Sequence, residues 1–339
     1  MRGRLLVDLA ALTANYADLC ALHAGDTAAV VKADAYGLGA ATVAPALAQA
    51  GCGTFFVAQA EEGAALRPHL PNAAIYVFEG PTDQTAAQLA AADLIPVINN
   101  PQQLQAWRRH ANRPMAIHVD TGIGRLGFDH DVTPGLFADF LPTLLLTHLA
   151  CADVPDHPNN RLQLERFVQV AQRFPDLPTS IGNSAGMQLG AEFCGDVARP
   201  GIGLYSAGHT GQRRCVASLQ GLVLQVRDHP SGSTIGYGAS YTTDRPARIA
   251  TVGLGYADGV IRSLSNRGQV GVGGVRCPVV GRVSMDLTLV DVTGANAASG
   301  DWVEFFGPTI ELEQVAELAG TIDYEVLTGV SPRVQRIYQ

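Results

Sequence analysis

Apolar and polar residues in the N-terminal part of the chain follow two alternating patterns. Short apolar runs bounded by polar residues are typical of strands buried in a parallel sheet. Eight such runs precede residue 200: Ala28–Val31, Thr54–Val57, Ala74–Phe78, Leu94–Ile98, Met115–Val119, Thr143–Thr147, Thr179–Ile181 and Asp196–Ala198.

Alanine-rich stretches with helical spacing lie between these runs: Ala40–Ala50, Gln59–Leu66, Thr82–Ala91, Gln102–His110 and Leu162–Phe174. A first helix is expected after Asp8, which is a good N-cap residue. Alternating strands and helices imply parallel strands joined by right-handed crossovers. Eight such strands predict an N-terminal (β/α)8 barrel of the TIM type.

The pattern changes near Arg213, where valine-rich segments separated by glycine-rich turns replace the helical stretches. These segments are Ser218–Val226, Arg248–Gly255, Gln269–Gly273, Val279–Val283, Leu287–Val292 and Trp302–Phe306. They predict a mainly antiparallel β domain, with Leu312–Ala319 as its one helix. The expected fold class is therefore α/β, with a barrel at residues 1–212 and a β domain at residues 213–339.

Composition narrows the classes of function. The chain has 339 residues and a net charge of -8, which argues against nucleic acid or an anionic membrane as a partner. No apolar run approaches the roughly 20 residues of a membrane span. The six cysteines form no CxxC pair, so we expect reduced thiols, no metal site and a cytoplasmic location.

Candidate site residues, which are basic side chains and small polar turns, follow several of the predicted strands, at the barrel end where active sites form. They are Lys32, Arg125, His148, Asn183, Ser184, Arg199, Gly201 and Ile202. A lysine desolvated at a strand end has a lowered pKa and can form a Schiff base. Positive charge beside the amides of small turns suits a phosphate. Together these features indicate pyridoxal phosphate as cofactor.

Each of these residues also has a structural interpretation. Arg125 could hold its own loop through Asp120, and His148 could be a buried structural histidine. Asn183 and Ser184 could serve only as a helix N-cap, and Arg199 could be a surface ion-pair residue. The coincidence of several such residues at strand ends favours a site.

Several segments resemble alanine racemase: Ala29–Gly39, Val119–Phe128, Asn183-Ser184, Ala198–Tyr205, Ile235–Tyr241, Gly253–Gly259 and Gly281–Asp286. The resemblance extends from the first helix to Arg336-Ile337-Tyr338. It implies a pyridoxal-phosphate enzyme that interconverts L-alanine and D-alanine and supplies D-alanine for peptidoglycan, with a catabolic role as the alternative. A serine or broader amino-acid racemase and a non-catalytic cofactor carrier are the other possibilities.

The resemblance also implies roles for single residues. Lys32 would bind the cofactor covalently and act as a base on one face of the substrate, and Tyr237 would be the base on the other face. Arg199 would face the pyridine nitrogen. The other implied cofactor-binding residues are Tyr36, His148, Asn183, Ser184, Gly201, Ile202 and Tyr324. The implied substrate-binding residues are Arg125, Tyr256, Met285 and Asp286. In this family Tyr237, Tyr256, Met285 and Asp286 reach the partner's barrel, so a head-to-tail homodimer with shared sites is implied.

His118 departs from the family pattern. Many members have a lysine at this position that is carbamylated and supports the arginine equivalent to Arg125. An imidazole cannot supply that anion, so no carbamylated lysine is expected and the support of Arg125 is left open, with a chloride ion and a nearby carboxylate as candidates.

Two other enzyme classes are weighed against this interpretation. A dinucleotide-binding loop at Gly37–Thr42 lacks the third glycine and a suitably placed acidic residue. A decarboxylase of the same fold would favour an acidic group where Arg199 stands.

Overall fold

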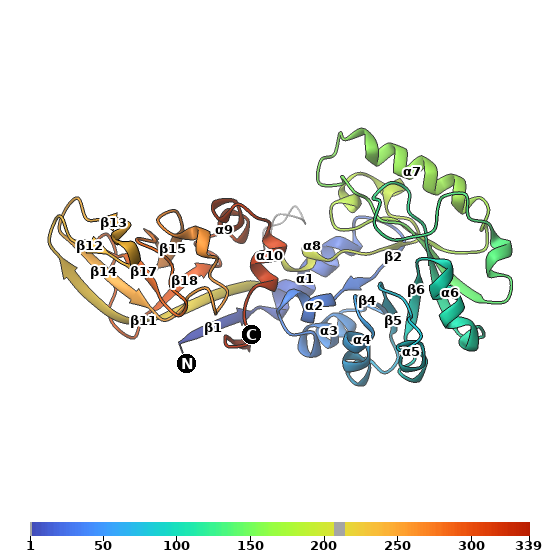
Figure 1. The fold of residues 1–339 in the computed structure, drawn as a ribbon, viewed down its shortest axis with the longest axis horizontal. Helices are drawn as coiled ribbons and strands as arrows, with labels where there is room; N and C mark the ends of the chain where they lie inside the picture. Colours follow the sequence, from blue (N-terminus) through green and yellow to red (C-terminus); the bar gives the residue numbers. More distant parts are fainter. Residues whose placement is uncertain (1, 207–213) are drawn as a thin grey trace. The chain divides into compact units, whose positions relative to one another are not determined.

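The computed structural model describes residues 2–206 and 214–339, and these form two compact units that we describe separately (Figure 1). The barrel unit comprises residues 13–35 and 39–204, and the β unit comprises residues 2–12, 36–38, 205–206 and 214–339. The predicted domain boundary between residues 212 and 213 lies outside the described residues.

The barrel unit is built on a parallel sheet in which β3 to β9 follow one another in sequence order. β10 returns to pair in parallel with β2, which directly precedes β3. Arg199 N–H donates to Gly182 O at 2.7 Å and links the segments that follow β10 and β9. The strands are β2 (Asp26–Thr27), β3 (Ala29–Val30), β4 (Thr54–Val57), β5 (Ala74–Val77), β6 (Ile95–Ile98), β7 (Pro114–His118), β8 (Leu141–Leu146), β9 (Thr179–Ser180) and β10 (Val197–Ala198). Every predicted run contains or overlaps one of them, so the predicted barrel is confirmed.

The helices of this part of the chain begin at recognisable caps. Asp8 Oδ1 accepts the N–H of Ala11 at 2.8 Å, as expected for the N-cap of α1 (Leu9–Cys20). The others are α2 (Lys32–Tyr36), α3 (Ala40–Gln49), α4 (Ala60–Leu66), α5 (Ala86–Ala91), α6 (Pro101–Trp107), α7 (Pro158–Ala171) and α8 (Ile202–Tyr205). α5 begins later than predicted because the hydroxyls of Thr82 and Thr85 each accept the other residue's N–H, which forms a turn first.

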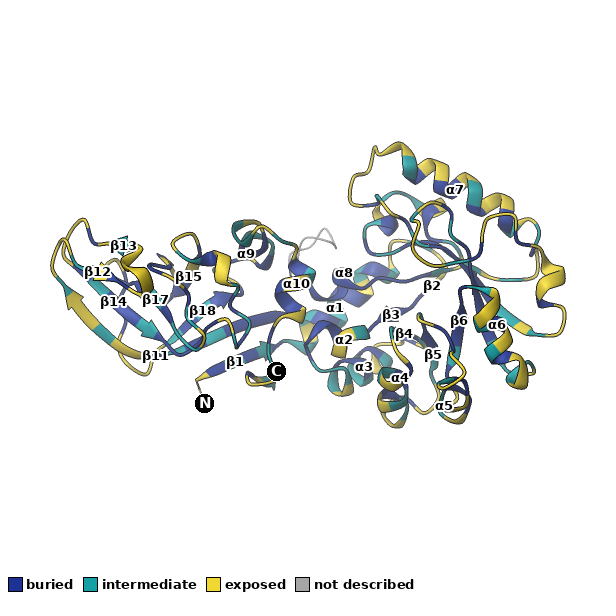
Figure 2. Cartoon of the chain, in the orientation of Figure 1, coloured by how far each residue is buried: buried dark blue, intermediate teal, exposed yellow. Residues whose placement is uncertain are grey.

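Burial follows the predicted patterns in the barrel unit. Figure 2 shows α7 with one buried and one exposed face, and its buried residues Leu164, Phe167 and Val170 recur at helical spacing. The three central residues of β7, Met115 to Ile117, are fully buried. Among the described residues, no helix is long and apolar enough to cross a membrane.

The β unit contains a sheet in the order β16-β15-β18-β11-β1-β19, and β14 pairs with both β11 and β17. Its strands are β1 (Gly3–Val7), β11 (Ala217–His229), β14 (Ala247–Val252), β15 (Gln269–Val272), β16 (Val275–Pro278), β17 (Thr288–Asp291), β18 (Trp302–Phe306) and β19 (Gln335–Tyr338). β12 (Thr234–Ile235) and β13 (Tyr241–Thr242) form a separate hairpin. Among the described residues of this unit only β1 and β19 pair in parallel, so the mainly antiparallel prediction is confirmed.

Two predictions for this unit are wrong. Val279–Val283 is not a strand, because Gly281 adopts φ 73° and donates its N–H to Asn266 Oδ1 at 2.6 Å. The strand is β16, which a two-glycine turn at positive φ joins to β15. Besides α9 (Leu312–Ala319), a second helix α10 (Asp323–Thr328) follows Gly320, which ends α9 in the left-handed conformation.

Candidate active site

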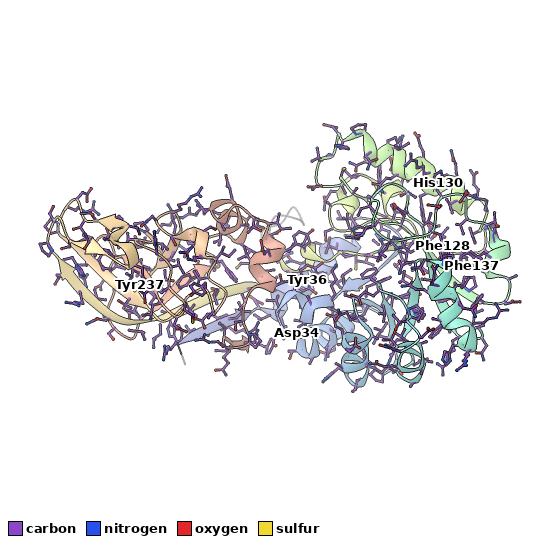
Figure 3. All side chains as sticks on the ribbon, viewed as in Figure 1. Asp34, Tyr36, Phe128, His130, Phe137 and Tyr237 are labelled. Carbon is purple, nitrogen blue, oxygen red and sulfur yellow. The ribbon has the colours of Figure 1, made fainter. Side chains whose placement is uncertain are left out.

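Lys32 follows β3 and begins α2, a turn with a left-handed backbone conformation. Ala33, Asp34, Ala35 and Tyr36 have φ between 52° and 56°, so α2 is a left-handed helical turn (Figure 3). This conformation brings Cβ close to the following carbonyl oxygen and costs roughly 1–2 kcal/mol per residue. Strain of this kind persists only where surrounding contacts fix the backbone.

Two carboxylates fix this backbone. One oxygen of Glu62 accepts the N–H of Ala33 at 2.6 Å, and its other oxygen accepts the N–H of Ala58 at 2.7 Å. Asp34 Oδ1 accepts the N–H of Ala40 at 2.7 Å, which ties the turn to the start of α3. The position of Lys32 is therefore set by α3 and α4 as well as by its own strand.

The ammonium of Lys32 lies in an apolar and cationic environment. Burial lowers the pKa of Lys32, the charge of Arg125 lowers it further, and Glu62 opposes both effects. Nζ lies 5.8 Å from the centre of the Phe78 ring. A lowered pKa raises the fraction of neutral amine, which is the form that attacks a carbonyl.

Two histidines near Lys32 are neutral. Burial and, after it, the charge of Arg199 lower the pKa of His118 and of His148 to about 3. Arg125 contributes in the same direction at both rings. At neutral pH the positive charge that acts on the lysine therefore comes from Arg125.

Arg199 is only 3% exposed. Its guanidinium donates to Ser180 Oγ, to Thr147 O at 2.5 Å and to Ile181 O at 3.4 Å. Burial lowers the pKa of Arg199 to about 10, which leaves it charged at neutral pH. All three acceptors are neutral, so Arg199 is a buried cation and not the surface ion-pair residue of the structural interpretation.

The turns after β9 and β10 are joined through Ser184. Its Oγ accepts the N–H groups of Gly201 at 2.9 Å and Gly203 at 3.0 Å. Within residues 2–206 and 214–339, no acceptor is found for the N–H groups of Ser184 and Ile202. Adjacent backbone donors of this kind can bind an anion such as a phosphate.

The side chains of Asn183 and Asp120 stabilise their own turns. Asn183 Oδ1 accepts the N–H of Gly186 at 2.8 Å, as the N-cap interpretation expected. Asp120 accepts the N–H groups of Gly122, Ile123 and Gly124, each at 2.9 Å. Among the described residues, it forms no ion pair with Arg125, whose side chain is exposed at the end of this loop.

Three of the tyrosines of the β unit form a cluster. The ring centres of Tyr36 and Tyr205 are 4.8 Å apart, and those of Tyr36 and Tyr324 are 5.9 Å apart. Burial, together with Tyr324 and Asp323, raises the pKa of Tyr36. Its hydroxyl therefore stays protonated and can donate a hydrogen bond.

The remaining candidates lie on three neighbouring loops of the β unit. Tyr237 is 71% exposed, Met285 54% and Tyr256 43% (Figure 3). Two of these loops are linked because Tyr256 N–H donates to Ser284 O at 3.0 Å. Asp286 pairs with Arg333 at 2.7 Å. Apart from Asp286, these are large hydrophobic side chains that are exposed to solvent.

The structure also assigns parts to residues that the sequence did not single out. Two such residues are Glu62, whose hydrogen bonds are described above, and Asn99. The Oδ1 atom of Asn99 lies 2.7 Å from Nδ1 of His118. Phe56 stacks between Tyr76 and Phe78, with ring centres 4.7 Å and 5.0 Å away. Glu62 is visible in sequence as the N3 residue of a capping box, three positions after the N-cap Gln59, but its bond to Ala33 is not.

Comparison with known proteins places both halves of the chain in one family. The family description "Alanine racemase, N-terminal domain" matches residues 7–208, and "Alanine racemase, C-terminal domain" matches residues 216–338. The alanine racemase of Acidiphilium cryptum is 45% identical over 98% of this chain and 98% of its own length. That of Jannaschia sp. is 46% identical, with the same coverage.

Solved structures agree in fold. The alanine racemase of Bartonella henselae, solved with covalently bound pyridoxal phosphate, covers 100% of both chains with 38% identity and a TM-score of 0.94. The biosynthetic enzyme of Pseudomonas aeruginosa is 34% identical, covers 100% of this chain and 99% of its own, and has a TM-score of 0.91. The chain described here belongs to the alanine racemase family.

Proposed function

We propose that this chain is a pyridoxal-phosphate-dependent alanine racemase. The observation that carries the proposal is Lys32, a lysine at the end of a barrel strand whose pKa is lowered by burial and by the charge of Arg125. The family relationship supports it over nearly the full length of the chain. A dinucleotide-dependent enzyme and a decarboxylase have no comparable support.

The residues present fit the cofactor. Lys32 would bind it covalently, and Arg199, with its charge unpaired, would face the pyridine nitrogen. The unpaired N–H groups of Ser184 and Ile202 would bind the phosphate together with Gly201, Tyr36 and Tyr324. His148 and Asn183 would line the same site. When bound, pyridoxal phosphate withdraws electrons from the substrate and makes its Cα proton acidic.

Racemisation requires proton removal from either face of one carbon atom. We assign Lys32 to one face and Tyr237 to the other. Arg125 and the Met285 N–H are assigned to the substrate carboxylate. Tyr256 and Asp286 would line the same part of the site. A phenol has an ordinary pKa of about 10, so Tyr237 must approach positive charge to act near neutrality. Arg199 is the buried cation available for this purpose, because His148 is neutral.

The proposed assembly is a head-to-tail homodimer in which Tyr237, Tyr256, Met285 and Asp286 complete the partner's site. The exposure of the large side chains of Tyr237 and Met285 supports it, because aromatic residues and methionine are enriched at interfaces between subunits. The proposed role is cytoplasmic supply of D-alanine. Alanine racemases named biosynthetic and catabolic in Agrobacterium fabrum are each 42% identical to this chain.

The test is a chiral assay of the purified protein with pyridoxal phosphate. Starting from L-alanine or from D-alanine, the reaction should end at equal amounts of both, because enantiomers have equal free energies. Lys32→Ala should abolish the reaction from either side. An unchanged enantiomer in both directions would refute the proposal.

Serine is the matched alternative substrate, because a pocket for a methyl group excludes an added hydroxyl only weakly. The proposal expects a higher kcat/KM for alanine than for serine in the same assay. The reverse order would identify a serine racemase.

A further inference from the structure

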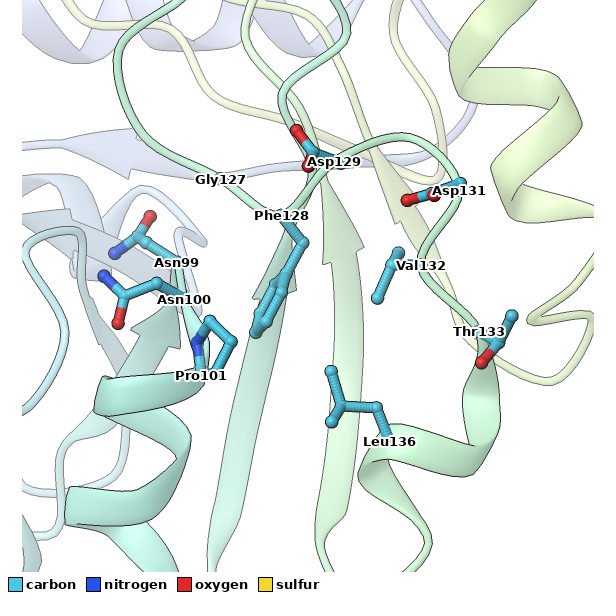
Figure 4. A pocket seen from close by; sticks show the side chains of 10 residues that line it. All are labelled: Asn99, Asn100, Pro101, Gly127, Phe128, Asp129, Asp131, Val132, Thr133 and Leu136. Carbon is cyan, nitrogen blue, oxygen red and sulfur yellow. The ribbon is translucent and has the colours of Figure 1, made fainter.

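Tyr256 and Met285, which are assigned to the substrate side, lie on exposed loops of the β unit. In the barrel unit, by contrast, Asn99 stands on the wall of a pocket of about 450 Å³ that Phe128 also lines (Figure 4). The exposed fractions of Tyr256 and Met285 are 43% and 54%. A loop that is open to solvent needs contacts of its own to present a backbone N–H in a fixed direction.

The turn at residues 255–258 supplies such contacts. Tyr256 N–H donates to Ser284 O at 3.0 Å, and Ala257 N–H donates to Met285 O at 2.9 Å. In a trans peptide the C=O and the N–H point in opposite directions, so the bond to Ser284 O directs the Met285 N–H away from this turn. Among the described residues, the Met285 N–H has no hydrogen-bond acceptor. It is therefore available to bind a substrate carboxylate.

Gly255 allows the turn to approach this backbone closely, because glycine has no side chain. A Cβ atom at this position would lie 2.3 Å from Ser284 O and 2.4 Å from Met285 O. The two segments are in direct backbone contact. A shift of the turn would therefore shift the Met285 peptide as well.

Two carboxylates flank this contact, and Arg333 binds both of them. Asp258, which is 6% exposed, accepts the N–H of Gly255 on Oδ2 at 3.0 Å and so closes the turn. Its other oxygen, Oδ1, lies 3.3 Å from Arg333 Nε. The Arg333 guanidinium also donates to Oδ1 of Asp286, the residue after Met285, at 2.7 Å. Arg333 therefore links the turn to the loop that carries Met285.

The backbone of Arg333 is attached to the same turn. Arg333 N–H donates to Ser331 Oγ at 3.2 Å, and Ser331 N–H donates to Asp258 O at 3.2 Å. The Arg333 side chain is about half exposed, and ion pairs of exposed side chains contribute little to stability. The orientation of the two loops is therefore a better account of this network than the stability of the fold.

We propose that Arg333 is a positioning residue that binds Asp258 and Asp286 together and so fixes the direction in which the Met285 N–H meets the substrate carboxylate. The inference rests on the proposed function, in which that N–H binds the carboxylate of a substrate held in the partner's barrel. Arg333 acts through the Met285 peptide and not on the reacting atoms. It should therefore govern the affinity for substrate and not proton transfer.

The first test is the kinetics of Arg333→Gln with alanine. A hydrogen bond to a charged group is weakened in substrate and transition state alike, so KM should rise about tenfold while kcat changes much less. The matched control is Arg245→Gln, because Arg245 is another exposed arginine of the β unit and pairs with the buried Asp291 at 3.5 Å. It should leave KM unchanged. An unchanged KM in Arg333→Gln, a loss confined to kcat, or an equal rise in both variants would overturn the proposal.

Arg333→Lys separates position from charge. The ammonium keeps the positive charge, but it lacks the planar fork of donors with which the guanidinium holds two carboxylates at once. KM should therefore rise nearly as far as in Arg333→Gln. A wild-type KM in Arg333→Lys would contradict the positioning argument, because charge alone would then be sufficient.

The second test observes the N–H group itself. In holoenzyme labelled with ¹⁵N-methionine, the Met285 amide signal is assigned by its loss in Met285→Leu. Titration with propionate, which is alanine without its amino group, should move this signal downfield as the N–H binds the carboxylate. Arg333→Gln should weaken the affinity for propionate about tenfold. Equal affinities of the variant and the wild type would refute the proposal.

Met115 and Met187, in the barrel unit, provide internal references in the same spectra. Their amide signals should be the same in the variant and the wild type, which shows that the variant is folded. If Arg333→Gln lost them, Arg333→Lys would be titrated in its place with the same expectation. If the wild type did not racemise alanine, the proposed function would fail, whereas the titration would still decide whether Arg333 controls the binding of a carboxylate at Met285.

Discussion

At the scale of single residues, Glu62 connects the predicted site to the scaffold behind it. Its carboxylate accepts the N–H groups of Ala33, Ala58 and Gln59. It also opposes the lowering of the Lys32 pKa. The hydrogen bonds need acceptors on both oxygens, and the effect on the pKa needs the negative charge.

Glu62→Gln should lower the free energy of unfolding by about 1–3 kcal/mol, because an amide group would face a backbone N–H with its own donor. Urea unfolding measures this. The matched control is Glu61→Gln, an exposed neighbour in the same helix, which should change stability by less than about 0.5 kcal/mol. Similar losses in both variants would show that the Ala33 contact contributes nothing.

His118 predicts a pH dependence of stability. Its folded pKa is about 3 against an ordinary value of 6.5, so between these values the unfolded chain binds the proton and the folded chain does not. The stability of the cofactor-free protein should therefore fall as pH falls from 6.5, by up to about 1.4 kcal/mol per pH unit for this residue.

Urea unfolding between about pH 5 and 7 checks the expectation. His118→Gln, which removes the titration, should show a shallower slope than the wild type. Identical slopes would mean that His118 titrates as it does in the unfolded chain.

The sequence predicted the residues at strand ends but not those that support them. Lys32 and Arg199 are found because a barrel collects the residues that follow its strands. Asn99 also follows a strand, yet its part depends on the orientation of Gln103 and on two carbonyl oxygens, which no sequence pattern reveals. Polar networks of this kind exist only after the backbone has placed their members.

At the scale of secondary-structure elements, the left-handed turn α2 is the most costly local feature. Alanine and tyrosine, which make up most of this turn, do not favour positive φ. Its conformation follows from the bonds to Glu62 and from Asp34, and not from local propensity. Sequence patterns likewise did not reveal β1 and β19, because β1 pairs with β11, more than 200 residues away.

Ala33→Gly should stabilise the protein by about 0.5–1 kcal/mol, because glycine adopts the observed φ of 52° without strain. Thermal or urea unfolding measures it. The same change at Ala46, within the right-handed helix α3, should destabilise by about 1 kcal/mol. The opposite signs test the backbone assignment; equal signs would refute it.

At the scale of the whole molecule, the proposed sharing of sites between subunits predicts that two inactive variants can restore activity to each other in a mixed dimer. Lys32→Ala and Tyr237→Phe should each inactivate the homodimer. If Tyr237 completes the partner's site, a dimer of one Lys32→Ala and one Tyr237→Phe chain contains one site with both changes and one site with neither.

Co-expression of the two variants should therefore restore about a quarter of the wild-type sites, since random pairing makes half of the dimers mixed. The assay is racemisation of L-alanine by the purified mixture. Absence of activity in dimers shown to be mixed would mean that Lys32 and Tyr237 act within one chain.

The most direct test of the two-base account is proton NMR of alanine in D2O with the wild type and with Tyr237→Phe. In the wild type, the Cα proton of either enantiomer should be lost as the opposite enantiomer appears. In Tyr237→Phe, exchange should continue for the enantiomer served by Lys32 and stop for the other, with inversion abolished. Equal loss of exchange from both enantiomers would contradict the assignment of Tyr237 to one face of the substrate.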